Sequence, residues 1–335
     1  FRRLGPLDIT VVGAIALAAL AGFAVLAWLV SGPTVIVNNG RTTIEAARGP
    51  LTGLACSDPV RRPIAVMLAS DPEARPLSGL RSADVVIEAP VTPSGITRYM
   101  AVFQCGAPEE IGSVRSARST FVPFVQGFDA IYAHWGGEYD VLALLDDGIV
   151  DNVDALKFEG TVYTRKFTVP RPHNGFTTLE ALREKAIDLG YRATTTLDPF
   201  VRESSVHAVR NLGNVADTIV LPGASGMDVV FKYDATSGTY GRWRGGEPEL
   251  DTIDDRQVTP AVVILMETEI IRTYDQYIDL DVVGSGTAKI YQGGRNIAAR
   301  WRKPAVGATL TFTDAQGSVL PLVPGQIWIV LIAQE

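Results

Sequence analysis

An uncharged apolar segment near the N-terminus, Ile9–Val30, places the strongest constraint on how this chain is organised. In a helix, its 22 residues rise by about 1.5 Å each and cover the roughly 30 Å of a bilayer core. Arg2 and Arg3 precede the segment, and Trp28 lies near its far end. This arrangement is typical of a cytoplasmic N-terminus with an interfacial indole on the other side. We therefore predict a cytoplasmic end at 1–8, a single transmembrane helix at 9–30 and extracytoplasmic domains beyond it.

A cleaved signal peptide is the alternative interpretation of this segment. Its apolar region would be shorter, and Ala46 and Ala47 form only a weak cleavage site. A lipid on Cys56 is a further alternative, because residues 53–55, GLA, loosely resemble a lipoprotein signal. The apolar segment ends far upstream of Cys56, so we expect the membrane helix to be the anchor.

Length and charge narrow the class of protein. A chain of 335 residues exceeds what one hydrophobic core usually supports, so we expect two folded units. The formal net charge of −7 argues against a nucleic-acid-binding protein, which would normally be basic. The membrane, reached through Ile9–Val30, is the first predicted partner.

The chain has two cysteines, Cys56 and Cys105. In an exported protein this number permits one disulfide, and the alternative is two free thiols. A bridge between them would tie the linker to a predicted strand. Neither cysteine has the histidine context of a thiol nucleophile.

Patterning predicts an α+β or α/β N-terminal domain at 59–210, after a linker at 31–58 that holds one short strand at 34–37. Apolar runs predict strands at 63–68, 83–88, 96–104 and 128–133, and residues 156–162 read as extended. Residues 117–125 and 138–146 have helical spacing. The clearest amphipathic helix is 178–189, with a threonine to cap it and Gly190 to end it.

The character of the chain changes at about residue 211. Short apolar runs alternate with glycine-containing turns, which predicts a β-rich domain at 211–335. Among the turns we place Gly284-Ser285-Gly286. The predicted strands are 229–233, 241–243, 261–268, 276–283, 287–292, 296–301, 309–313 and 326–332.

The stretch Ile111–Glu138 is the best candidate for a functional site. Arg115 and Arg118 are three residues apart, so on a helical turn they share a face. Together with Arg98 in a strand and Arg171 in a loop, they suit phosphate or carboxylate binding. The alternative is a set of structural ion pairs, with partners among Glu88, Glu109, Glu110 and Asp129.

Two histidines lie in loop contexts that suit acid–base chemistry. His134 precedes a glycine pair, and His173 precedes Asn174, which could orient a ligand. The alternative for each histidine is a buried ring bonded to a backbone carbonyl. Glu88 and Glu138 are possible carboxylate partners, and two carboxylates at a cleft could hydrolyse a glycoside.

The sequence gives no sign of a metal or cofactor. Its histidines lack metal-ligand spacing, and it contains neither a phosphate-binding loop nor a nucleophile elbow. We therefore predict no metal and no cofactor.

Several motifs, in order, resemble the YerB-like bacterial lipoproteins, a family with paired N- and C-terminal modules of unknown function. The resemblance covers roughly residues 61–331 and implies an exported, envelope-located protein with an α/β or α+β first module and a β-rich second one. It does not supply a reaction. Members are typically anchored by a lipidated cysteine, from which the predicted membrane helix departs. The motifs are RPIAVML, ARPLSGL, ADVVIE, GITRYMAVF, IGSVRSAR, DAIYAHWGG, RPHN, TYGRWRGGEPELDT, GSGTAKIYQGGRNIAARWRK and PGQIWIVL.

Three functional hypotheses follow. The first is a membrane-anchored protein that binds an anionic envelope component, either a cell-wall polymer or an envelope protein, through an arginine–histidine cleft. The second is a hydrolase or transferase acting on a cell-wall polymer, with His134, His173, Glu88 and Glu138 as candidate catalytic groups. The third is an accessory subunit of a membrane complex.

Overall fold

The computed structural model describes residues 34–38, 41–197, 200–209, 211–223, 227–274 and 276–334. The predicted transmembrane helix at 9–30 lies outside these residues. Within them, no helix is both long and apolar enough to cross a membrane. The segment predicted as a linker forms an antiparallel hairpin of β1 (Thr34–Asn38) and β2 (Arg41–Glu45).

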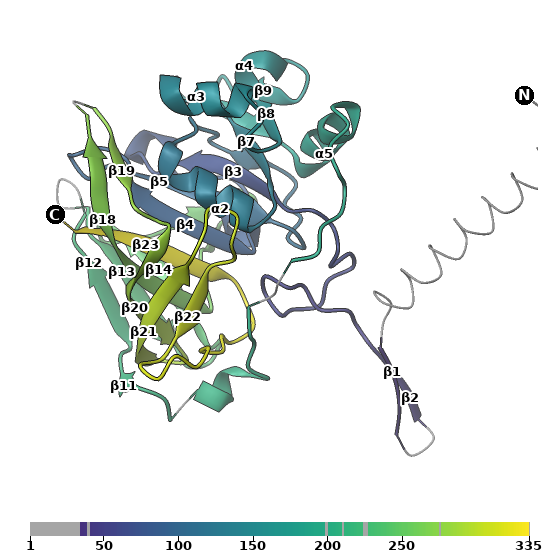
Figure 1. The fold of residues 1–335 in the computed structure, drawn as a ribbon, viewed down its shortest axis with the longest axis vertical. Helices are drawn as coiled ribbons and strands as arrows, with labels where there is room; N and C mark the ends of the chain where they lie inside the picture. The colour runs from purple at the N-terminus through teal and green to yellow at the C-terminus, as the bar shows by residue number, and fades with distance from the viewer. Residues whose placement is uncertain are drawn as a thin grey trace, which may run out of the picture.

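A mixed sheet of 12 strands runs through the molecule (Figure 1). Ten strands follow the order β11-β21-β20-β18-β23-β4-β5-β3-β7-β8, and β19 and β22 pair with β18 and β21. From the N-terminal half come β3 (Ile64–Ala69), β4 (Val85–Pro90), β5 (Thr97–Phe103), β7 (Ile131–His134) and β8 (Asn152–Asp154). From the C-terminal half come β11 (Asn214–Val215), β18 (Val262–Thr273), β19 (Ile278–Leu280), β20 (Gly284–Gln292), β21 (Arg295–Lys303), β22 (Thr311–Thr313) and β23 (Ile327–Gln334).

The N-terminal half is α/β-like. Its strands β3, β7 and β8 are parallel neighbours. The helices are α2 (Val122–Gly127), α3 (Tyr139–Asp146), α4 (Ala155–Phe158) and α5 (Leu179–Asp188). Helices α3, α4 and α5 lie around β7 and β8 in Figure 1. Single 3₁₀ turns are η1 (Pro72–Ala74), η2 (Leu80–Ser82), η3 (Ser119–Phe121) and, nearer the second half, η4 (Val206–Val209).

Helix α5 shows why the local sequence folds as predicted. The Thr178 hydroxyl accepts a hydrogen bond from the backbone N–H of Ala181 and so caps the first turn. Leu179, Leu182 and Ala186 form its buried stripe. Gly190, at a φ of 77°, then ends the helix in a left-handed conformation that glycine adopts without strain.

The C-terminal half is β-rich. Besides its strands in the large sheet, it forms a four-stranded sheet of β12 (Thr218–Leu221), β13 (Val229–Asp234), β14 (Thr239–Arg244) and β15 (Glu247–Pro248). Phe231 of this sheet packs edge-on against Trp328 of β23, with ring centroids 6.1 Å apart. In a smaller pairing, β16 (Leu250–Asp251) lies beside β17 (Arg256–Gln257). In a three-stranded sheet, β10 (Gly175–Thr177) lies between β6 (Ile111–Gly112) and β9 (Tyr163–Arg165).

The two halves share one sheet and both hydrophobic cores. Strand β23 pairs in parallel with β4, which joins the C-terminal strands to the N-terminal ones. On one face Met67 and Ile264 belong to the same buried cluster, and on the other face Val66 and Trp328 do. The predicted combination of an α/β-like first part and a β-rich second part is confirmed, and the sheet between them is continuous.

Two local predictions are wrong. Residues 156–162 are not extended throughout, because Leu156 lies in α4, where the Asp154 carboxylate accepts a hydrogen bond from its backbone N–H and starts a helical turn. Gly284-Ser285-Gly286 is the start of β20 rather than a turn. A Cβ on Gly286 would lie 2.5 Å from the Trp301 indole nitrogen, so glycine here serves close packing within a strand.

Cys56 and Cys105 form a disulfide with an S–S distance of 2.05 Å and a Cα–Cα distance of 5.5 Å. The bridge links the segment before β3 to the residues just after β5, as the sequence suggested.

Candidate functional site

Three of the predicted site residues gather around Asp71, which follows the carboxyl end of β3. Arg98, at the start of β5, forms an ion pair with Asp71 at 2.9 Å. The His173 Nδ1 lies 4.0 Å from the same carboxylate, and Arg115 donates a hydrogen bond to the Pro172 carbonyl at 3.2 Å. Burial lowers the pKa of Arg98 to about 10, and Asp71 opposes this effect. Burial also lowers the pKa of His173.

Arg118 pairs with Glu138 beside this cluster. The two side chains approach to 2.9 Å, and the Arg118 guanidinium lies 4.7 Å from the ring centroid of Tyr277. Burial raises the pKa of Glu138 to about 6, although Arg118 acts in the opposite direction. Glu138 and Tyr277 line a groove of about 610 Å³.

Two of the four predicted arginines, Arg98 and Arg118, form ion pairs, but the carboxylate partners predicted for that alternative are wrong. Asp71 and Glu138 are the carboxylates found beside Arg98 and Arg118. A loop position such as Asp71 cannot be matched to a distant strand residue without the tertiary fold.

His134 is fully buried, and its hydrogen-bond partners are not the predicted arginines. Its Nδ1 is 2.9 Å from the Gly136 carbonyl, and its Nε2 is 3.3 Å from the Asn152 side-chain oxygen. Burial lowers its pKa, which favours the neutral ring. This environment matches the alternative of a structural histidine.

The loop residues predicted to bind a ligand are also separated. Arg171 is exposed, whereas Asn174 is buried and its side-chain oxygen accepts a hydrogen bond from Arg165 at 3.0 Å. Asn174 thus holds the β9–β10 loop. Among the described residues, no three His, Cys, Asp or Glu side chains gather as a metal-ligand set.

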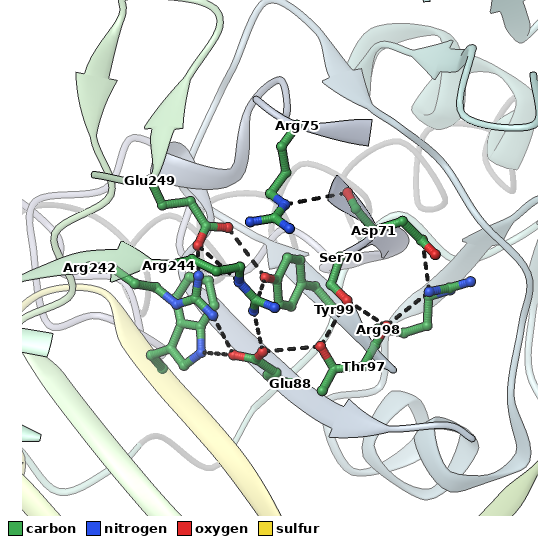
Figure 2. A network of polar contacts seen from close by, with 11 residues as sticks. Ser70, Asp71, Arg75, Glu88, Thr97, Arg98, Tyr99, Arg242, Arg244 and Glu249 are labelled. Atoms are coloured by element: carbon green, nitrogen blue, oxygen red, sulfur yellow. Dashed lines mark hydrogen bonds and ion pairs between the residues drawn. The ribbon is translucent and has the colours of Figure 1, made fainter. Parts of the chain in front are cut away.

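Glu88 is the centre of a second polar network, shown in Figure 2. It accepts hydrogen bonds from Arg242 at 2.8 Å and Arg244 at 2.7 Å, and also from the Trp328 indole at 3.0 Å and the Thr97 hydroxyl at 3.1 Å. Burial alone would raise the pKa of Glu88, but the two arginines and the indole outweigh it and lower the pKa to about 2. Glu88 is thus a buried, permanently charged carboxylate, unsuited to acid–base catalysis.

The arginines of this network come from β14. Arg242 and Arg244 are two residues apart, so the strand's alternation sends both to the same face. Arg242 is fully buried, 4.5 Å from the ring centroid of Trp328, and it also pairs with Glu249. Two carboxylates, Glu88 and Glu249, therefore balance two guanidinium groups.

An open groove of about 770 Å³ lies over this network. Its polar part includes Asp71, Glu88 and Arg244, and Glu73 lies exposed at the rim. Its apolar part is supplied by β12, β13, Met227 between these two strands, and the end of β23. The side chains are Leu221, Met227, Val229, Val330, Leu331 and Ile332.

Arg75 is the cation of this groove that lacks a carboxylate partner within the described chain. Its Nε donates to the Asp71 backbone carbonyl at 3.4 Å, and Figure 2 shows the side chain extending toward Arg244. Burial lowers the pKa of Arg75, and the nearby charge of Arg244 adds to that effect. Arg75 therefore faces the groove without an ion pair within the described chain, although the Glu73 carboxylate lies at the same rim and the charge of Asp71 acts to raise the pKa of Arg75.

Sequence reasoning missed Arg75, Arg242 and Arg244, although a signal was present. Arg75 lies in the motif ARPLSGL, and the other two lie in TYGRWRGGEPELDT. Two arginines at alternate positions of a strand place two positive charges on one face. If that face is buried, carboxylates must pair with them, because an unpaired buried charge is costly.

Comparison with known families covers both halves of the chain. Residues 51–192 match the family described as "Protein of unknown function (DUF3048) N-terminal domain", and residues 219–329 match the corresponding C-terminal domain. The chain is 32% identical over 294 residues to YerB of Bacillus subtilis (strain 168), a protein whose name assigns it provisionally to the lipoproteins. That alignment covers 87% of each chain.

A solved structure agrees with this relationship. The crystal structure of YerB from Bacillus subtilis matches with a TM-score of 0.76 and 31% sequence identity. The match covers 85% of this chain and 96% of the solved one.

Proposed function

The chain belongs to the DUF3048 family of YerB-like proteins, as its motifs predicted. From this premise we propose that it is an extracytoplasmic envelope protein that binds an anionic ligand in the groove over Glu88. The lipoprotein name of its relative supports a membrane-associated location outside the cytoplasm. The Cys56–Cys105 disulfide also supports an oxidising compartment.

The Arg75 guanidinium, which forms no ion pair within the described chain, carries the proposal. A guanidinium fork presents several N–H donors and binds carboxylate or phosphate in a bidentate manner. In this groove Arg75 has one backbone contact and stands beside a second arginine, Arg244, whose own charge is balanced. An incoming anion would gain Arg75 as a partner and relieve the repulsion between the two arginines.

The remaining lining restricts the ligand further. Polar groups lie at one end of the groove, and aliphatic side chains from β12, β13 and β23 line the rest. A ligand with a charged end and an apolar body suits this distribution better than a uniformly charged polymer does.

The predicted arginine–histidine cluster adjoins the groove rather than lining it. Asp71 joins the two, because it lines the groove and also binds Arg98. In the proposal, Arg98, Arg115 and His173 hold the Asp71 loop in place, and Arg75 makes the direct contact.

Titration of the full-length chain with inorganic phosphate tests the proposal. A charge-assisted hydrogen bond contributes about 1.5–3 kcal/mol, so Arg75→Gln should weaken binding by roughly 10- to 150-fold. Arg300→Gln removes the same charge from an exposed position on β21 and should leave the affinity within about twofold. Equal affinity of wild type and Arg75→Gln would remove the groove from consideration.

One observation favours a second candidate, a hydrolase or transferase acting on a wall polymer. Glu138 lines a groove, and its pKa of about 6 is close to the range of a general acid or base. Incubation of the chain with purified cell-wall polymer would show turnover that Glu138→Gln abolishes. Polymer that stays intact under conditions of measurable binding would exclude this candidate.

A further inference from the structure

The end of β23 presents an open strand edge to the groove. On one side β23 pairs with β18 over its whole length, from Ile327 to Gln334. On the other side it pairs with β4 only from Ile327 to Val330. Among the strands that the structure describes, none pairs with this side of residues 331–334, and Val330–Ala333 line the groove.

Pro90 explains why the pairing stops. Continuing the register of Val330 opposite Glu88 would place Ile332 opposite Pro90. Proline has no backbone N–H and cannot donate to the next rung, so the ladder between β4 and β23 ends there. The backbone of β23 beyond this point is left facing the groove.

Strand alternation identifies the backbone groups that face the groove. The Ile327 N–H donates to the Asp84 carbonyl beside β4, whereas the Gln326 carbonyl accepts from Val262 of β18. Odd-numbered residues of β23 therefore direct their backbone groups toward the β4 side. By this rule the Leu331 carbonyl and both backbone groups of Ala333 point into the groove.

We infer that the groove takes an extended peptide with a free C-terminal carboxylate, added as an antiparallel strand to residues 331–334 of β23. This inference rests on the proposed function, because Arg75 is the anchor in both. The strand edge supplies main-chain hydrogen bonds, and Leu221, Met227 and Val229 supply apolar contacts for alternate side chains.

Charge fixes the direction of the peptide. Arg244 donates to Glu88, which pairs with Val330, and Arg75 lies beside Arg244. The two groove arginines therefore lie where β23 meets β4, and β23 runs from there toward Gln334. A peptide antiparallel to β23 therefore has its C-terminus at this end of the groove and brings its carboxylate to Arg75. At about 3.4 Å per residue, three or four peptide residues span the open edge.

The first experiment measures binding of N-acetyl-Ala-Val-Ala-Val to the full-length chain, as the free acid and as the C-terminal amide. We expect the free acid to bind and the amide to bind at least tenfold more weakly. Methylation of the peptide nitrogens that face β23 should abolish binding, and methylation of the alternate nitrogens should not. Equal affinity of acid and amide, or of the two methylated series, would overturn the inference.

A protein variant gives an independent test. Ala333→Pro removes an N–H that faces the groove and not β18, so the sheet keeps its ladder. The variant should no longer bind the peptide but should still bind inorganic phosphate. If it fails to fold, the methylated peptides decide the question with the wild-type protein.

The outcomes separate the two proposals. Phosphate binding that depends on Arg75, without binding of either peptide, would refute the strand addition and leave the proposed function standing. If the wild-type protein binds neither phosphate nor the free-acid peptide, both the proposed function and the strand addition are refuted. Peptide binding that Arg75→Gln does not weaken would refute the assignment of the carboxylate to Arg75.

Discussion

Glu88 gives the sharpest test of the electrostatics beneath the groove. Its folded-state pKa of about 2, against an ordinary carboxyl value of 4.5, corresponds to about 3 kcal/mol of stability. Because the folded pKa is the lower one, this contribution is fully present above pH 4.5. It is lost as the pH falls from 4.5 toward 2.

Glu88→Gln removes this charge and keeps the shape of the side chain. At pH 7 the variant should be less stable than wild type by at least the 3 kcal/mol from ionisation, because Arg242 and Arg244 also lose their shared partner. Urea unfolding followed by tryptophan fluorescence is repeated from pH 7 to pH 2. The difference in free energy of unfolding between wild type and Glu88→Gln should fall by about 3 kcal/mol below pH 4.5. Glu184→Gln, at an exposed position on α5, should stay within about 0.5 kcal/mol of wild type at every pH. A stability difference between wild type and Glu88→Gln that is equal at pH 2.5 and pH 7 would show that ionised Glu88 does not stabilise the fold.

Three further predictions concern other parts of the molecule. Replacing Cys56 and Cys105 by serine should cost about 4 kcal/mol, because the bridge closes a loop across a separation of 49 residues, and thermal melting should then no longer respond to dithiothreitol. In an NMR titration, the Glu138 carboxyl should have its midpoint near pH 6, and Arg118→Ala should raise it, because Arg118 favours the carboxylate; an unchanged midpoint would show that the ion pair has no effect. His134→Ala should destabilise the fold by about 1–3 kcal/mol, since it leaves buried polar groups unpaired, yet leave phosphate affinity unchanged; a loss of affinity at constant fold would return His134 to the site.

Much of the fold follows from local patterns. Apolar runs such as residues 63–68 identified the central strands because a strand buried on both faces has few polar positions. The amphipathic stripe and threonine cap identified α5 for the same local reasons. The parallel pairing of β4 with β23 could not be predicted, because Val85 and its partner Ile327 are far apart in the chain. That pairing unites the two halves and creates the groove between them.

The site was harder to predict than the fold. Residue type alone drew attention to Arg98 and Arg118, but whether an arginine is free or paired depends on which carboxylate the tertiary structure brings to it. Asp71 and Glu138 neutralise these two, while Arg75, in an ordinary proline-containing loop, is left over. The prediction that Arg98, Arg115, Arg118 and Arg171 bind an anion stays a prediction, and the proposal for Arg75 is separate from it.

Arginine side-chain NMR can show whether an anion contacts Arg75. The Nε–H resonance of Arg75, assigned by its disappearance in Arg75→Gln, is followed while inorganic phosphate is added to the full-length chain. We predict a saturable shift of this resonance with the dissociation constant measured for binding, while that of Arg300 stays in place. Phosphate binding that shifts other arginines and leaves Arg75 unmoved would contradict the account.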